Sequence, residues 1–137
     1  MNEQVKKEAF KLISKRDYFS GELKRKLLQK GFEEKDIDEV IDFLVKEEYI
    51  HDEKLKERYK ELAIQKGKSK LALKKKLYQK GIEALELSYE EELQSALNLL
   101  NNKYKKEKEF KSILKFLINR GFSYSVAKEA SNIYLKD

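Results

Sequence analysis

The chain has 137 residues, 41% of them charged, and a formal net charge of +6. It contains no cysteine, which excludes disulfides and thiolate metal ligands, and no apolar run approaches the roughly 18 residues that span a bilayer. The first ten residues carry acidic side chains without an apolar run, so no secretory signal is expected. Proline is absent, and abundant Leu, Lys and Glu favour helix in most windows.

The first predicted element is an amphipathic helix near residues 5–13. Apolar residues there fall at i, i+4, i+7 and i+8, the spacing of one buried helix face. The same spacing recurs 50 residues later, and a similar stripe follows near residue 93. The three stripes are Val5, Ala9, Leu12 and Ile13; Leu55, Tyr59, Leu62 and Ala63; and Leu93, Leu97, Leu100 and Tyr104. We name these predicted elements the A helices.

A second predicted set, the B helices, ends each time in a nearly identical hexamer. The hexamers are LLQKGF at 27–32, LYQKGI at 77–82 and LINRGF at 117–122. The apolar residues of the three B helices are Leu23, Leu27 and Leu28; Leu73, Leu77 and Tyr78; and Ile113, Leu117 and Ile118. Ser20 is expected to cap the first of these helices, and Ser69 the second. Such internal repetition is typical of stacked structural repeats.

Each hexamer has the chemistry of a helix end. A basic residue favours the negative end of the helix dipole, and the glycine after it can adopt the left-handed conformation that terminates a helix. The next apolar residue can then fold back on the last turn. We therefore expect the hexamer to be a helix terminator used three times.

The third predicted set, the C helices, is complete in only two copies. The first copy has its stripe at Ile37, Val40, Ile41 and Leu44, and the last at Ala127, Ala130 and Tyr134. The middle counterpart holds only Leu85 and Leu87 before a run of glutamates. We expect an all-α, elongated tandem array of three three-helix repeats, 1–50, 51–89 and 90–137. The last helix of the middle repeat is expected to be shortened or merged with the next, at an irregular junction near 83–92.

No pattern in the sequence favours catalysis. His51 stands beside Asp52, but adjacent residues do not make a catalytic pair, and Asp52 is interpreted as the cap of the second A helix. Glu90, Glu91 and Glu92 point in different directions on a helix, so a solvated face is preferred to a metal site. With one histidine, no cysteine and no phosphate-binding glycine loop, neither an enzyme nor a bound cofactor or metal is expected.

The informative feature is an uneven charge distribution. Residues 66–80 hold seven lysines and no acid, and without these seven the 31 basic residues fall to 24, against 25 acidic ones. The candidate binding residues are Lys66, Lys68, Lys70, Lys74, Lys75 and Lys76, followed by Lys24, Arg25 and Lys26 at the matching positions of the first repeat. In the third repeat those positions read Leu114, Lys115 and Phe116, so the pattern fades.

Three interpretations of this basic segment remain open. The lysines can form an ordinary solvated helix face, can contact phosphates of a nucleic acid, or can dock on an acidic groove of a protein. Reading of specific bases is disfavoured, because no helix carries an array of Asn, Gln or Arg side chains. Clustered cations without acids indicate a polyanionic partner.

Several of these motifs, in order and spacing, resemble the RecX family, regulators of the RecA recombinase. The matched residues are Arg16, Glu22, Leu23, Leu27, Lys30, Gly31, Leu44, Tyr49, Ile50, Asp52, Gly67, Leu73, Leu77, Lys80, Gly81 and Ile82. The resemblance is good over residues 16–82 and weaker afterwards, although the RGF of residues 120–122 suits the third repeat. The chain departs from the family pattern at Phe19, at Leu55 and Lys56, and in a shorter segment between the second and third repeats.

The resemblance implies a fold of tandem three-helix repeats and a partner, the RecA filament on DNA. Members of this family lie in the filament groove, generally inhibit strand exchange, ATP hydrolysis and co-protease activity, and in some cases bind DNA directly. We therefore expect a cytoplasmic, monomeric modulator of RecA that has no membrane or small-molecule partner. The alternatives are a stand-alone helical protein that binds nucleic acid without sequence specificity, and a scaffold whose lysines only keep it soluble.

Overall fold

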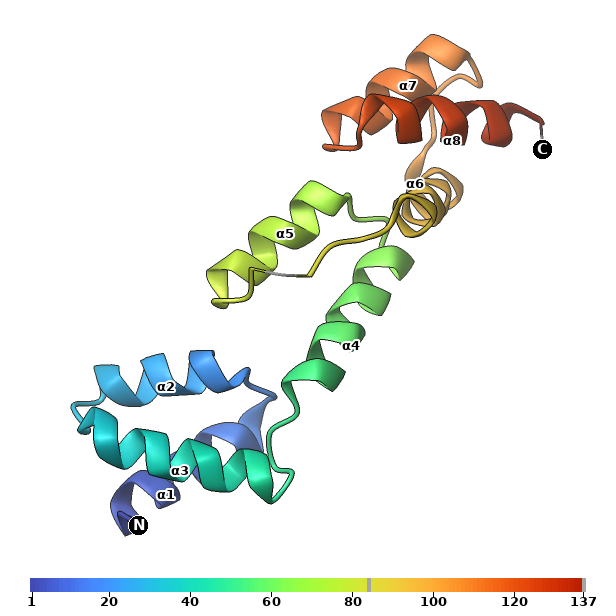
Figure 1. Cartoon of the computed structure of the whole chain (residues 1–137). Coiled ribbons are helices and arrows are strands. Elements are labelled where there is room, and N and C mark those ends of the chain that lie inside the picture. The colour runs from blue at the N-terminus through green and yellow to red at the C-terminus, as the bar shows by residue number, and fades with distance from the viewer. Residues whose placement is uncertain (84, 137) are drawn as a thin grey trace. The chain divides into compact units, whose positions relative to one another are not determined.

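The computed structural model describes residues 1–83 and 85–136, which form α-helices without any strand (Figure 1). The expectation of an all-α fold is confirmed. None of the helices in this described part combines the length and apolar character that crossing a bilayer requires. The helices are α1 (Glu3–Lys15), α2 (Ser20–Gln29), α3 (Glu34–Lys46), α4 (Asp52–Gln65), α5 (Lys70–Gln79), α6 (Tyr89–Lys103), α7 (Phe110–Asn119) and α8 (Tyr124–Lys136).

Internal contacts divide the chain into two compact units, Met1–Glu57 and Arg58–Asp137. The division falls within α4. The three-repeat boundaries at residues 50 and 89 stay a prediction, with which the order of the helices is compatible.

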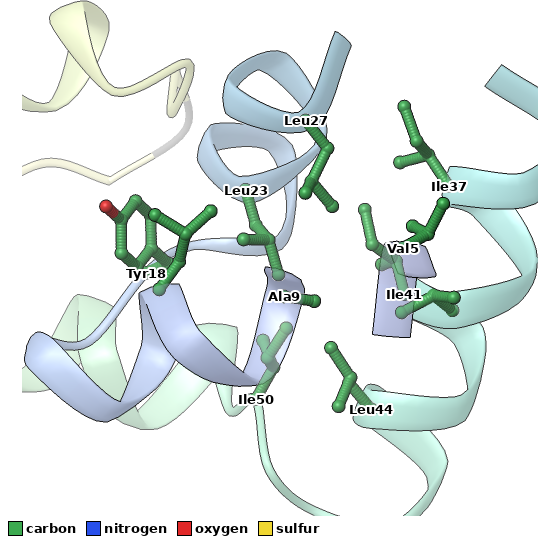
Figure 2. Close-up of a cluster of buried hydrophobic side chains, with 11 residues drawn as sticks. Val5, Ala9, Tyr18, Leu23, Leu27, Ile37, Ile41, Leu44 and Ile50 are labelled. Atoms are coloured by element: carbon green, nitrogen blue, oxygen red, sulfur yellow. The ribbon is translucent and has the colours of Figure 1, made fainter. Parts of the chain in front are cut away.

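The first unit is a three-helix bundle of α1, α2 and α3 followed by the start of α4. Its apolar side chains converge between the three helices (Figure 2). The stripe expected on the first A helix is buried except at Ile13, which is half-buried, and the stripe of the first C helix is buried throughout. The core residues are Val5, Ala9, Leu12, Tyr18, Leu23, Leu27, Ile37, Val40, Ile41, Leu44 and Ile50.

The second unit has its largest core between α6, α7 and α8. Leu73 and Leu77 on α5 are also buried, as their stripe predicted. The shared core residues are Ala96, Leu99, Leu100, Tyr104, Ile113, Leu117, Phe122, Val126, Ala127 and Ala130. Between α5 and α6, residues 82, 83 and 85–88 are not helical, which is compatible with a middle C helix that is shortened or merged with the next helix. Ala84 of this junction lies outside the described residues.

The three hexamers end their helices in the same way. Gly31, Gly81 and Gly121 have φ angles of 93°, 81° and 93°, the left-handed conformation that glycine adopts without a steric penalty. After α2, the N–H of Phe32 donates to Leu27 O at 3.4 Å, and the corresponding bonds after α5 and α7 are 2.9 and 3.2 Å. These bonds satisfy carbonyls that the helix end leaves open. The predicted terminator is confirmed in all three copies.

The expected helix caps are corrected at two of three positions. Ser69 caps α5, since its hydroxyl accepts the N–H of Ala72 at 3.0 Å. Ser20 is instead the first residue of α2, and the N–H of Phe19 before it donates to a carboxylate oxygen of Glu22 at 3.1 Å. Asp52 does not precede α4 but is its first residue, and its carboxylate accepts the N–H of Ser20 at 2.8 Å instead of capping its own helix.

Two predicted apolar stripes differ from the buried faces that form. Leu62 on α4 is 42% exposed. On α6, Leu93 and Leu97 are only half-buried, whereas Ala96 and Leu99 are buried. Glu92 and Ser95 are buried on α6 as well, because both make polar contacts with the segment before α5 and with α5 itself. The buried face of α6 therefore includes polar residues and differs from the apolar stripe that the sequence predicted.

Candidate functional site

The basic segment 66–80 comprises the loop 66–69 after α4, the whole of α5, and Lys80 after it. Its lysines at 66, 68, 74, 75 and 76 are exposed, and Lys70 is half-buried, while Leu73 and Leu77 face inward. The helix therefore presents an almost continuous cationic surface to solvent, with Leu71 and Tyr78 exposed among the lysines.

Gly67 fixes the path of the loop between α4 and α5. Its φ angle is 72°, and a Cβ at this position would lie 2.5 Å from the Cβ of Leu99 on α6. Real Cβ atoms do not approach other atoms so closely, so only glycine lets the loop backbone pack on α6. Lys66 and Lys68, on either side of Gly67, are thereby held beside α6.

Polar side chains of α6 hold the same loop. The amide of Asn98 donates to Ile64 O at 2.9 Å, and the hydroxyl of Ser95 donates to Lys68 O. Ile64 O, in the last turn of α4, also accepts the N–H of Gly67 at 3.1 Å, and Lys68 O lies in the loop after this helix. The backbone that carries Lys66 and Lys68 is therefore fixed at both ends.

A buried carboxylate holds the start of α5. One oxygen of Glu92 accepts the N–H of Lys70 at 2.9 Å, and the other accepts the hydroxyl of Ser123 at 3.2 Å. Glu92 is only 4% exposed. The expectation that the glutamate run 90–92 is a solvated face is therefore wrong for Glu92, since a carboxylate is stabilised where backbone N–H groups point at a helix start.

Two of the six predicted lysines on this segment already have an acidic neighbour. The Nζ atoms of Lys70 and Lys74 lie 3.5 and 4.0 Å from the carboxylate of Glu86. Such partly exposed pairs contribute at most about 1 kcal/mol, and a competing anion can displace them. Lys66, Lys68 and Lys75 form no ion pair with any described acid.

On the first unit, Lys24 is engaged internally. Its Nζ lies 2.9 Å from Asp38 and 3.0 Å from Glu34, both on α3. Hydrogen bonds to Asp38 and then Glu34 raise the pKa of Lys24 above its ordinary value. Arg25 and Lys26 are exposed on the same helix, α2.

Three adjoining pockets extend the basic surface of the second unit. The Tyr59 pocket, about 350 Å³, includes Lys66, Lys68 and Lys76 in its lining. The Leu99 pocket, about 360 Å³, is lined by Lys66, Lys68, Lys103 and Arg120 among others. The Phe116 pocket, about 450 Å³, is lined by Lys106, Lys115, Asn119 and Arg120 together with Ser112.

Four of these cations are absent from the residues that the sequence indicated. Lys103 ends α6, Lys106 follows it, Lys115 is on α7, and Arg120 follows α7. They lie far along the chain from residues 66–80. Glu107 and Glu109 interrupt the lysines around 103–111, and Lys115 and Arg120 stand apart from one another, so a search for one dense acid-free segment did not reveal them. The sequence indicated a role for Arg120 only in ending a helix, as the basic residue of the third hexamer.

The pockets combine cations with aromatic rings. The Nζ of Lys76 lies 5.4 Å from the ring centroid of Tyr59, and the guanidinium of Arg120 lies 4.3 Å from that of Phe116. Within the described residues, no acidic side chain lines any of the three pockets. An anion entering them would meet only positive and neutral groups.

The described residues give no sign of a metal site. Nowhere in this part of the chain do three His, Cys, Asp or Glu side chains come together as an ion would need. His51 is exposed just before α4.

The family model and the similar proteins that match this chain all point to one family. Residues 6–44 match the family described as RecX, first three-helix domain. A Regulatory protein RecX of Chlorobium limicola is 34% identical over 138 residues, covering 88% of this chain and 83% of the relative. Its counterpart from Vibrio parahaemolyticus is 30% identical over 130 residues, covering 87% and 84%. That from Clostridium tetani is 31% identical over 145 residues, covering 94% and 66%.

Proposed function

Because this chain belongs to the RecX family of regulatory proteins, we propose that it modulates, and most often inhibits, the RecA recombinase. Membership in a family of regulators also confirms the expectation that the chain is not an enzyme. We place its action in the cytoplasm, as a monomer, on the filament that RecA forms with DNA.

The proposed mechanism is docking of the basic surface on this filament, where acidic protein side chains and phosphates lie close together. A protein bound there would hinder the changes that accompany ATP hydrolysis, strand exchange and co-protease activity. The contact residues proposed are the nine that the sequence indicated. Among them Lys66, Lys68, Lys75 and Lys76 are exposed without an acidic partner in the described chain, so they should contribute most.

The observation that carries the proposal is the concentration of charge in one exposed segment. Residues 66–80 supply seven positive charges to a chain that otherwise has 24 basic and 25 acidic residues. The electric field of such a charge cluster raises the rate at which the protein meets a polyanion and orients the two molecules. This effect weakens as the salt concentration rises. A scaffold whose lysines only keep it soluble does not need its positive charge concentrated in one segment.

The test is a titration of the protein into a reaction of RecA, single-stranded DNA and ATP, with ATP turnover as the readout. Direct DNA binding is measured in parallel at two salt concentrations. Inhibition at protein amounts well below the concentration of DNA sites supports modulation of RecA, because simple competition for DNA would need stoichiometric protein.

The three acid-free pockets favour one rival, a stand-alone nucleic-acid-binding protein. It predicts salt-sensitive DNA binding with no effect on RecA at substoichiometric amounts. If neither effect is found, the lysines serve only solubility and the proposal is wrong.

A further inference from the structure

We propose that the second unit has a docking pocket for a segment of a partner protein in which a carboxylate lies next to a bulky apolar side chain. Glu86 of this chain occupies the carboxylate position until the partner displaces it. The inference rests on the proposed function, because it names the kind of protein surface on the filament that this chain contacts. Its test contains no RecA, so the two proposals can fail separately.

The pocket, about 370 Å³ in volume, is lined by the first half of α5, the segment 86–88, the first turn of α6 and the turn between α7 and α8. We call it the Leu71 pocket. Two lysines of α5, Lys70 and Lys74, lie in its lining together with Leu71. It therefore places cations beside an apolar surface.

The apolar part of the Leu71 pocket is open to solvent. Leu71 is 62% exposed and Tyr89 is 43% exposed, although both line the pocket. The hydroxyl of Tyr89 donates to the carboxylate of Glu129 on α8, which fixes the position of the ring. An apolar side chain of a partner can therefore bury surface against two side chains that are already in place.

The chain itself shows which chemistry occupies the cations of this pocket. The carboxylate of Glu86 lies 3.5 Å from the Nζ of Lys70 and 4.0 Å from that of Lys74. Leu87, the next residue, is buried and also lines the pocket. A carboxylate followed by an apolar side chain is thus the arrangement that the pocket already holds, and it indicates the chemistry of the partner segment.

Glu86 can leave the two lysines without unfolding of its segment. Its side chain is exposed, and ion pairs of this kind are weak enough for a competing carboxylate to displace them. The backbone after it is held by the buried Leu87 and by Ser88, whose hydroxyl accepts the N–H of Glu91 at 3.1 Å. Rotation of one side chain therefore frees both cations.

A buried acid in the lining favours a protein segment over a nucleic acid. Glu92 lines the pocket and is held there by the N–H of Lys70, so it cannot swing away as Glu86 can. A nucleic-acid strand carries a negative charge at every nucleotide and would be repelled by this fixed carboxylate. A single carboxylate can reach Lys70 and Lys74 while its apolar neighbour occupies the rest of the pocket.

The experiment measures, by fluorescence anisotropy, binding of a labelled copolymer of glutamate and tyrosine, with polyglutamate and a single-stranded oligonucleotide as comparison probes. Glu86→Gln is matched by Glu83→Gln, because Glu83 is an exposed acid before the same helix that neither lines the pocket nor forms an ion pair with a described base. Leu71→Ser is matched by Tyr78→Ser, an exposed position of α5 outside the pocket. Circular dichroism checks that the variants keep their helices.

We expect Glu86→Gln to bind the copolymer about fivefold more tightly, which is the upper limit of what a partly exposed ion pair contributes. Glu83→Gln should gain less than about twofold. Leu71→Ser should bind the copolymer about fivefold more weakly, because less apolar surface is buried, and should bind polyglutamate as the unaltered protein does. Tyr78→Ser should change the binding of neither polymer.

Four results would overturn the inference. Equal gains from Glu86→Gln and Glu83→Gln would mean that only net charge matters. Copolymer binding that Leu71→Ser leaves unchanged, or that Tyr78→Ser weakens as much, would remove the role of the apolar part. A gain in oligonucleotide binding by Glu86→Gln as large as that for the copolymer would assign the lysines to phosphates. Absence of copolymer binding even to Glu86→Gln would show that the pocket docks no such segment.

Discussion

A carboxylate oxygen of Glu92 at the start of α6 accepts the backbone N–H of Lys70, the first residue of α5, at 2.9 Å. The first unit contains the same arrangement. There a carboxylate oxygen of Asp52, at the start of α4, accepts the N–H of Ser20, the first residue of α2, at 2.8 Å. In each unit, an acid in the first turn of one helix thus stabilises the N-terminus of an earlier helix: Glu92 on α6 holds α5, and Asp52 on α4 holds α2.

The Glu92 contact should be important for stability. Replacing Glu92 with Ala leaves a part-buried N–H at Lys70 without its acceptor, so the free energy of unfolding should fall by about 2 kcal/mol. Glu92→Gln keeps one acceptor oxygen and should cost about half as much. Urea denaturation followed by circular dichroism measures both, and amide hydrogen exchange at Lys70 should accelerate. Unchanged exchange at Lys70 in Glu92→Ala would show that the bond does not form.

The close approach at Gly67 gives a second prediction. Gly67→Ala places a Cβ against Leu99 and forces a positive φ on alanine, so it should lower the free energy of unfolding by about 3 kcal/mol. Gly21→Ala is the matched control, because Gly21 lies in α2 with no atom near the added methyl, and should stabilise by about 0.5 kcal/mol. Thermal melts of the two variants should therefore shift in opposite directions.

Glu48, just after α3, has a φ of 64° without being glycine. The N–H groups of Glu48 and Tyr49 donate to Val45 O and Leu44 O, so the residue occupies the position that glycine fills in the three hexamers. Glu48→Gly should raise the free energy of unfolding by about 0.5–1 kcal/mol, because the left-handed conformation is strained for other residues. Glu47→Gly, at an ordinary φ of −86°, should lower it by a similar amount and serves as the control. Equal effects of the two substitutions would contradict the assignment.

Glu91 should make stability depend on pH in the acid range. The N–H of Ser88 and then the ammonium of Lys60 hold the pKa of Glu91 below its ordinary value of 4.5. The resulting stabilisation is complete above that value and is lost as the pH falls through the lower native pKa. Wild type should therefore melt above Glu91→Gln at neutral pH, and the gap should shrink at acid pH. A constant gap would show that the charge of Glu91 is not responsible.

The sequence predicted the features whose physical cause is local. The hexamers could be interpreted because a basic residue, a glycine and an apolar residue satisfy the helix end within six positions. Leu73 and Leu77 could be assigned to the core because helical spacing alone places them on one face. The family resemblance rests on the same local motifs.

The features that were missed depend on contacts between distant segments. Asp52 and Glu92 are acidic residues in the first turn of a helix, which is common. Only the fold shows that each side chain contacts an earlier helix. Lys103 and Arg120 lie 17 positions apart in the sequence, and packing of α6 and α7 brings them to one pocket. The charge count could find the dense segment 66–80 but could not find cations that only the fold assembles.

The most direct test of the central proposal uses the variant Lys74→Glu, Lys75→Glu and Lys76→Glu in the RecA-dependent ATPase reaction on single-stranded DNA. We predict that the unaltered protein lowers ATP turnover at amounts well below the DNA sites, and that the triple variant, with unchanged helical content, does not. Inhibition by the triple variant equal to that of the unaltered protein would contradict docking through the basic surface.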